Sequence, residues 1–151
     1  MKKISDLKNE IGQKTLNMFL LGWVTLGIYY IIWLVERYKV FNRIAGKEIV
    51  SRNYIIWIAA LMGISSIFSY AGNPMVELFG SAIDMVWGIM FIITAFKISK
   101  AIDEYYTKEF KLDLSFNKFY LVIFNLFYIN YCINELEEIE KKQEHLQSEN
   151  R

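Results

Sequence analysis

Apolar residues gather along the chain into four stretches separated by charged segments. The stretches cover residues 16–35, 54–72, 75–96 and 119–133. Apolar runs of about 18 residues or more with few charges are typical of helices that cross a membrane, whereas runs of about 10–14 are more often interfacial or re-entrant. The pattern predicts an all-α membrane protein, with residues 1–151 forming a single membrane domain.

The two central stretches form the clearest predicted element, because no Lys or Arg occurs from 53 to 96. At the helical rise per residue, 54–72 and 75–96 would extend about 28 Å and about 33 Å, close to the roughly 30 Å of a bilayer's hydrocarbon core. The Gly72-Asn73-Pro74 sequence between them favours a turn, and proline suits the first position of a helix. We therefore predict a transmembrane helical hairpin.

The positions of the Lys and Arg residues bear on the two outer stretches. If all four stretches cross, one side of the membrane carries 7 of these residues and the other carries 10. If 16–35 and 119–133 are re-entrant, all 17 lie on one side and only the turn at 72–75 lies on the other. The positive-inside rule favours the second arrangement. It places both termini in the cytoplasm, and a four-pass helical bundle is the alternative.

Both outer stretches have features of a bent helix. The second is only 15 residues long and has Asn125 and Asn130 in its interior, which favours a re-entrant segment. The first is long enough to cross, but its centre reads Thr25-Leu26-Gly27, and we expect a bend there. It is also too long for the apolar core of a signal peptide, so we expect no cleavable one.

Three polar or amphipathic segments follow these stretches on the expected cytoplasmic side. Segments 36–50 and 97–111 have amphipathic helical patterns, and their basic residues suit a position beside anionic lipid headgroups. The second equally suits a helix that packs on its neighbours. The tail, 134–151, is polar and acidic, with Leu136, Ile139 and Leu146 at 3-4 spacing. It favours a solvated helix, with docking of a protein partner or a second copy as the alternative.

Residues 25–42 resemble the signature of a family of small bacterial multi-pass membrane proteins that is known only as a domain of unknown function. In that signature Thr-x-Gly-Ile-Tyr is followed by Trp and then by Asn. The matching positions are Thr25, Gly27, Ile28, Tyr29, Trp33 and Asn42. Segment 128–136 is similar to the family's closing segment. The resemblance implies a multi-pass helical fold in the bacterial cytoplasmic (inner) membrane, and it implies no activity.

Residues that carry enzyme chemistry are scarce in this sequence. His145 in the polar tail is the only histidine and Cys132 the only cysteine, so one chain cannot assemble a Ser-His, Cys-His or multi-histidine metal site. Phosphate-binding and dinucleotide-binding glycine motifs are absent. The 17 Lys and Arg nearly balance the 16 Asp and Glu, which does not favour a nucleic-acid partner. We expect a non-catalytic protein without metal or cofactor.

Asp84 lies inside the second predicted membrane helix, where an ionised carboxylate costs several kcal/mol unless it is paired, hydrated or protonated. Gly80 and Gly88 share its face of the helix, and Gly63 and Ser66 lie on one side of the preceding helix. Folding the hairpin about position 73 predicts that Asp84 faces Gly63, near Ser66. Asp84 is then a hydrogen-bonded packing residue, a proton or cation relay, or a contact to a partner.

Two functions from different classes follow from these patterns. The first is a non-catalytic accessory, scaffold or membrane-shaping module. The second is a small oligomeric transporter or channel subunit that uses Asp84, because one hairpin per chain is too small to enclose a pathway.

Overall fold

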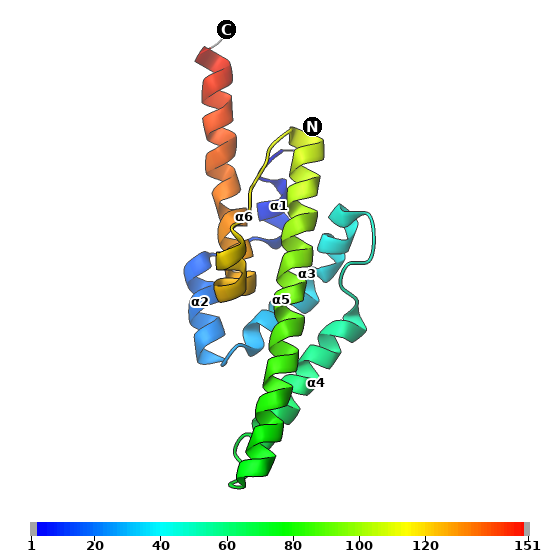
Figure 1. Ribbon diagram of the computed structural model, residues 1–151. Coiled ribbons are helices and arrows are strands. Elements are labelled where there is room, and N and C mark those ends of the chain that lie inside the picture. The colour runs from blue at the N-terminus through cyan, green and yellow to red at the C-terminus, as the bar shows by residue number, and fades with distance from the viewer. Residues whose placement is uncertain (1–2, 150–151) are drawn as a thin grey trace.

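The computed structural model describes residues 3–149, and it describes the side chains of all of them except 137, 140, 143, 144 and 146–149. The protein is all-α, with 81% of its residues helical, and no strand occurs within 3–149. The helices of this part of the chain are α1 (Asp6–Ile11), α2 (Thr15–Val24), α3 (Ile28–Ala45), α4 (Arg52–Phe68), α5 (Pro74–Phe110) and α6 (Lys118–Glu149) (Figure 1).

Helices α4 and α5 form a hairpin, and α5 runs along most of the molecule (Figure 1). The Asn73 side chain accepts a hydrogen bond from the N–H of Met75 (3.0 Å), and Pro74 is the first residue of α5. The helix then continues without a break to Phe110. The predicted membrane segment 75–96 and the predicted amphipathic segment 97–111 are therefore parts of one helix, because nothing in the sequence between them interrupts helical hydrogen bonding.

The other two apolar stretches are interrupted. Between α2 and α3 the backbone takes left-handed conformations at Leu26 (φ 50°) and Gly27 (φ 90°), so 16–35 contains two helices, and α3 continues through 36–45. Helix α6 breaks at Asn125 (φ 48°, ψ −126°) and then runs to Glu149. Both ends of the described chain lie away from the α4–α5 turn (Figure 1).

The far end of α6 projects beyond the rest of the molecule (Figure 1). Leu136 is fully buried and Ile139 packs at the edge of the core. The Leu146 side chain, which belongs to the predicted docking stripe of the tail, lies outside the described side chains. Docking by the tail therefore stays a prediction.

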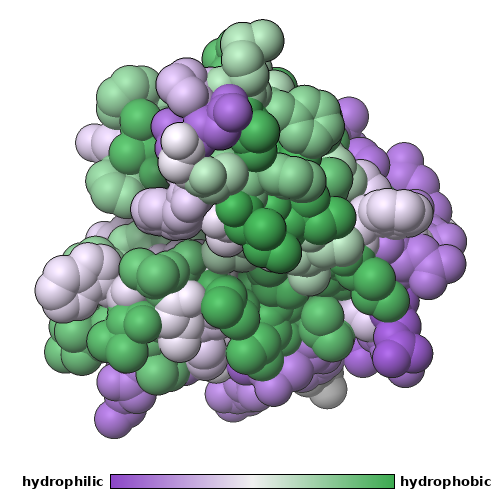
Figure 2. Space-filling view, turned by 90° about the horizontal axis from the view of Figure 1, so that it is seen from below, coloured by the Kyte–Doolittle hydropathy of each residue, from purple (hydrophilic) through white to green (hydrophobic). Residues whose placement is uncertain are grey.

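The buried core and the exposed apolar surface occupy different parts of the protein. Trp33, Phe41, Ile98 and Tyr106 are among the fully buried side chains. Large apolar side chains remain exposed on α2, α4, the first half of α5 and the start of α6. Seen from the end that carries the α4–α5 turn, the surface is largely apolar, with hydrophilic residues mainly at its rim (Figure 2). Surfaces of this kind mark contacts with lipid or with other proteins.

Within residues 3–149, two helical segments are long and apolar enough to cross a membrane: Pro74–Phe110 and Lys118–Leu136. Helix α4 is apolar but shorter. These are statements of length and composition, and they are compatible with the membrane association that the sequence predicts.

Candidate functional site

The turn between α2 and α3 satisfies its own backbone N–H groups. The Thr25 hydroxyl donates to the carbonyl of Leu21 (2.6 Å) and accepts from the N–H of Tyr29 (3.0 Å), so it closes α2 and caps α3. The remaining N–H groups donate at 2.8–3.1 Å to backbone carbonyls of the turn and of the last turn of α2; they belong to Thr25, Leu26, Gly27, Ile28 and Tyr30. No amide from 25 to 30 therefore depends on water for its hydrogen bond.

Thr25 and Gly27, which the sequence analysis singled out in segment 25–42, both have a structural role in this turn. Gly27 adopts φ 90°, which is strained for residues with a Cβ, and Thr25 supplies the acceptor that an ordinary loop would obtain from solvent. Ile28 is 53% exposed and belongs to the apolar surface. These residues build a compact turn.

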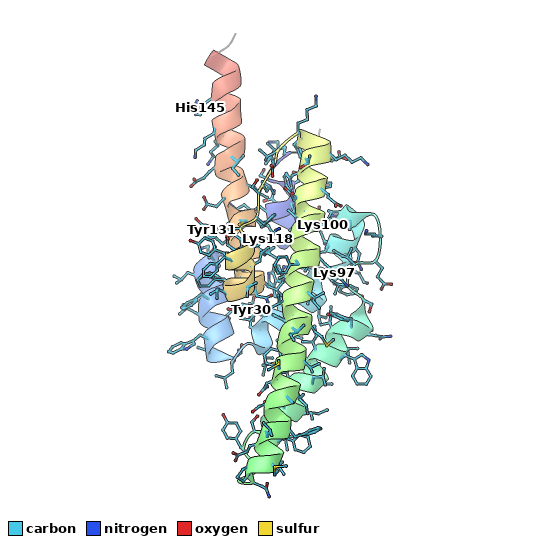
Figure 3. The ribbon with its side chains drawn as sticks, viewed as in Figure 1. Tyr30, Lys97, Lys100, Lys118, Tyr131 and His145 are labelled. Atoms are coloured by element: carbon cyan, nitrogen blue, oxygen red, sulfur yellow. The ribbon has the colours of Figure 1, made fainter. Side chains whose placement is uncertain are left out.

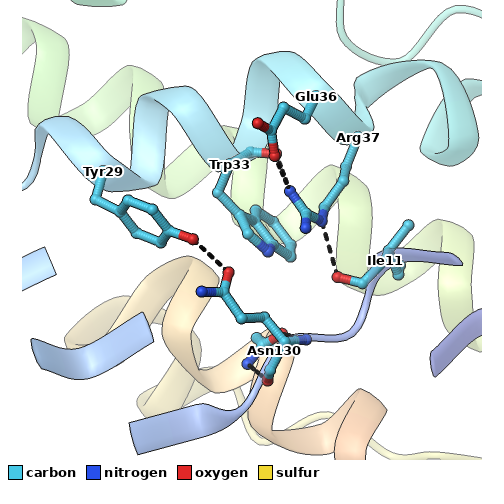
Figure 4. A network of polar contacts seen from close by, with 7 residues as sticks. Ile11, Tyr29, Trp33, Glu36, Arg37 and Asn130 are labelled. Atoms are coloured by element: carbon cyan, nitrogen blue, oxygen red, sulfur yellow. Dashed lines mark hydrogen bonds and ion pairs between the residues drawn. The ribbon is translucent and has the colours of Figure 1, made fainter. Parts of the chain in front are cut away.

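Tyr29 and Trp33 connect α3 to the N-terminal segment. The Tyr29 hydroxyl donates to Oε1 of Gln13 (2.5 Å) (Figure 4). The Arg37 guanidinium lies over the ring of the fully buried Trp33, 5.2 Å from its centroid, and its Nε donates to the carbonyl of Ile11 (2.9 Å). The Trp33 indole N–H finds no acceptor in the part of the chain that the structure describes.

Asn42, the last residue of the segment 25–42 singled out in the sequence, holds the loop between α3 and α4. Its Oδ1 accepts from the N–H groups of Ile49 (2.9 Å) and Val50 (3.1 Å), and its Nδ2 donates to the carbonyl of Val50 (2.8 Å). Three bonds to two consecutive residues fix where α4 begins relative to α3.

Gln13 is the centre of a polar clamp between the N-terminal segment and α6. The Asn130 side chain, fully buried, accepts from the Gln13 N–H (3.0 Å) and donates to its carbonyl (2.8 Å). The Asn134 side chain donates to the same carbonyl (2.7 Å) and to the Thr15 hydroxyl (2.9 Å). With the Tyr29 bond, Gln13 joins α3 to α6, and Asn134 adds the bond to Thr15 at the start of α2.

Asp84 accepts hydrogen bonds from neighbouring side chains, among them Ser65 in the last turn of α4. The Trp87 indole N–H donates to its Oδ1 (2.8 Å), and the Ser69 hydroxyl donates to its Oδ2 (3.4 Å). The predicted partner, Ser66, instead donates to the carbonyl of Met62 (2.9 Å). Because its partners on this side are Ser65 and Ser69, Asp84 lies beside the last turn of α4.

The small residues of the hairpin do not form the predicted mutual contact. A Cβ placed on Gly80 would lie 2.8 Å from the backbone N of Ser69 and 3.0 Å from the carbonyl carbon of Phe68, so α4 and α5 approach closely there. A Cβ on Gly63 or Gly88 would meet nothing within 4 Å. The non-helical residues 69–73 span more length per residue than a helix, and this shifts α5 relative to the predicted pairing.

Residues 13–104 match the family described as Domain of unknown function (DUF4234). The chain belongs to this family. The DUF4234 match begins at Gln13 and covers α2, α3, α4 and most of α5, whereas α1, α6 and the similar segment 128–136 lie outside it. No curated protein and no solved structure matches the chain.

Sequence reasoning missed Gln13, Ser69 and Trp87. Trp87 follows Asp84 at i+3, a spacing at which helical side chains meet, whereas Ser69 lies 15 residues away across the α4–α5 turn. The i+3 spacing was a usable signal. Gln13 bonds residues more than a hundred positions away, and nothing in its local sequence indicates this.

Proposed function

We propose that this DUF4234 protein is a non-catalytic integral membrane module of the bacterial cytoplasmic membrane. In this proposal α4 and the first half of α5 cross the bilayer as a hairpin. The paired helices α2 and α3, and the two parts of α6, enter the cytoplasmic leaflet and turn back. Both termini lie in the cytoplasm.

The turn between α2 and α3 is the observation that carries the proposal. An unsatisfied backbone group costs several kcal/mol in hydrocarbon, so a turn at membrane depth needs internal partners for its amides. All N–H groups from 25 to 30 have such partners. The side chains around the turn are apolar and exposed: Trp23 is 73% exposed, Val24 75% and Leu26 84%. A loop that lay in water would need neither property.

Helix lengths support entry into one leaflet. Helix α2 has 10 residues and extends about 15 Å, half of a hydrocarbon core of roughly 30 Å. The part of α6 before its break at Asn125 is shorter still. Lys97, Lys100 and Lys118 lie on the half of the molecule away from the α4–α5 turn (Figure 3), at the level expected for anionic lipid headgroups.

Two broken elements beside one hairpin occupy area in a single leaflet. A protein of this shape suits an accessory, scaffold or membrane-shaping role, because it adds volume to one leaflet and little to the other. The projecting end of α6 is available to a protein partner or to a second copy of the chain (Figure 1).

Cysteine labelling tests the topology. In a Cys132→Ser background, single cysteines replace Lys3, Ile44, Gly72 and Glu104, and intact cells are treated with a thiol reagent that does not cross the membrane. We expect labelling at position 72 alone, with the other three labelled only after permeabilisation. Labelling of positions 44 and 104 in intact cells, with 3 and 72 protected, would establish the four-pass bundle and overturn the proposal.

A small oligomeric transporter or channel subunit is the second candidate function. The observation that favours it is Asp84, a carboxylate within the apolar run that is held by Trp87 and Ser69. Replacing Asp84 by Asn keeps the size of the side chain and removes its charge. Proteoliposomes carrying the Asp84→Asn variant would then lose a pH-dependent or ion-dependent flux that the unchanged protein supports, whereas a scaffold would show no such flux in either form.

A further inference from the structure

A cavity of about 300 Å³ lies where the two interrupted elements meet the hairpin. Its wall includes Gly27 at the α2–α3 turn and Asn125 at the break of α6. Met62 of α4 and Trp87 and Phe91 of α5 form the opposite side. The lining is mostly apolar and aromatic, so the cavity suits a hydrocarbon or aromatic occupant rather than an ion.

The helix breaks explain why a space remains here. Gly27 has no side chain to fill the gap toward α4; the nearest heavy atom to a Cβ at this position would be Cε of Met62, at 3.7 Å. At Asn125 the backbone leaves the helix, which interrupts the regular row of side chains that packs into the grooves of a neighbouring helix. The breaks at Gly27 and Asn125 both face α4 and α5, and the side chains around them leave the space between unfilled.

The cavity opens onto the apolar surface of the protein. Phe19, Ile123 and Phe124 belong both to its lining and to that surface, where they are 51%, 57% and 49% exposed. Under the proposed placement the turns at Gly27 and Asn125 are the deepest points of the two re-entrant elements. The opening then lies near the middle of the bilayer, where the ends of lipid acyl chains are the molecules at hand.

We propose that the terminal part of a lipid acyl chain occupies this cavity. The volume corresponds to about ten water-sized units, which accommodates a short stretch of one chain and is too small for a helix of another protein. The inference rests on the proposed function, because only a protein within the bilayer presents the opening to chain ends. Lipid thereby completes the packing between the re-entrant elements and the hairpin.

Photolabelling tests whether an acyl chain occupies the cavity. It compares residues of α5 that lie at about the same depth in the bilayer, one facing the cavity and two facing outward. Phe91 lines the cavity and is only 9% exposed, whereas Ile89 and Ile93 are 51% and 44% exposed on the outer surface. The full-length protein is reconstituted in phosphatidylcholine vesicles whose acyl chains carry a diazirine either at the chain end or next to the carbonyl. Labelled residues are located by mass spectrometry after irradiation.

We expect the chain-end probe to label Phe91 as strongly as Ile89 and Ile93, and the probe next to the carbonyl to label none of the three. Met62→Trp fills the cavity, so it removes the label from Phe91 and leaves Ile89 and Ile93 labelled. Met85→Trp, on the exposed face of α5, is the control and changes nothing. Circular dichroism verifies that both variants fold. The comparison of Phe91 with Ile89 and Ile93 in the unchanged protein does not depend on either variant.

The outcomes separate the two proposals. Labelling of Ile89 and Ile93 without Phe91 overturns the acyl-chain site and leaves the membrane placement intact. Absence of label from all three residues overturns the membrane placement itself. Labelling of Phe91 that persists in the folded Met62→Trp variant also overturns the site, because the label then reaches Phe91 by another route.

Discussion

Replacing Gly80 by alanine tests how closely α4 and α5 approach each other. The added Cβ would lie 2.8 Å from the backbone N of Ser69 and 3.0 Å from both the carbonyl carbon and Cβ of Phe68. Two of these three atoms belong to the backbone, so the contact is not relieved by the rotation of a flexible side chain. Either the end of α4 moves or the two helices separate.

Gly88 provides a matched control eight residues further along the same helix. A Cβ there meets nothing within 4 Å. In each variant the change from glycine to alanine increases intrinsic helix stability by about 1 kcal/mol. Overpacking at Gly80 costs about 1–3 kcal/mol. The propensity gain cancels in the comparison, so we expect Gly80→Ala to have a lower free energy of unfolding than Gly88→Ala by about 1–3 kcal/mol.

The free energy of unfolding is measured in mixed detergent micelles by titration with a denaturing detergent, with helix content followed by circular dichroism. We expect Gly88→Ala to be more stable than the unchanged protein, and Gly80→Ala to be less stable than Gly88→Ala. Equal stabilisation by the two substitutions would refute the close approach of α4 and α5 at Gly80.

Three further predictions concern asparagine side chains. Replacing Asn125 by Gly is expected to raise the free energy of unfolding by about 1 kcal/mol, measured by the same titration, because it relieves a left-handed conformation and removes a buried unpaired oxygen. Asn130→Ala removes two bonds to the Gln13 backbone; we expect a loss of about 2 kcal/mol and faster hydrogen exchange of the Gln13 amide. Asn42→Ala frees the loop that precedes α4, and we expect faster trypsin cleavage after Lys47.

Asn17 supplies a common control for the last two substitutions. It is exposed on α2, so Asn17→Ala removes an amide of the same kind without opening the core. We expect it to leave Gln13 exchange and cleavage after Lys47 unchanged. If Asn42→Ala and Asn17→Ala are cleaved at the same rate, Asn42 does not hold the loop. If Asn130→Ala leaves Gln13 exchange unchanged, the clamp is absent in solution.

Local patterns account for the elements that the sequence predicts well. The turn at Gly72-Asn73-Pro74 works through the Asn73 side chain, which caps the helix that Pro74 begins. The bend in 16–35 depends on Gly27 and on Thr25, which bonds residues only four positions away in each direction. Interactions of such short range are encoded where they occur, so the sequence reveals them without knowledge of the fold.

The candidate residues of the hairpin show where this reasoning fails. Each residue turns a helix by about 100°, so a small error in register directs a different face toward the neighbour. The face of α4 that carries Gly63 and Ser66 lies outward, and Ile55, Ile58 and Ser65 are the buried residues. The identities of the small residues were clear, but their partners depended on how many residues the turn consumed.

The sequence by itself determined the helical class, the stretch free of Lys and Arg, and the turn at Gly27, because these arise from composition or from contacts a few residues apart. The resemblance of residues 25–42 to a known family indicated the family. Only the tertiary structure decided that Ser69 bonds Asp84, that Gln13 joins the N-terminal segment to α3 and α6, and that a cavity separates the breaks from the hairpin. These features depend on register and on contacts between distant segments, which the pattern of apolar residues constrains too weakly to specify.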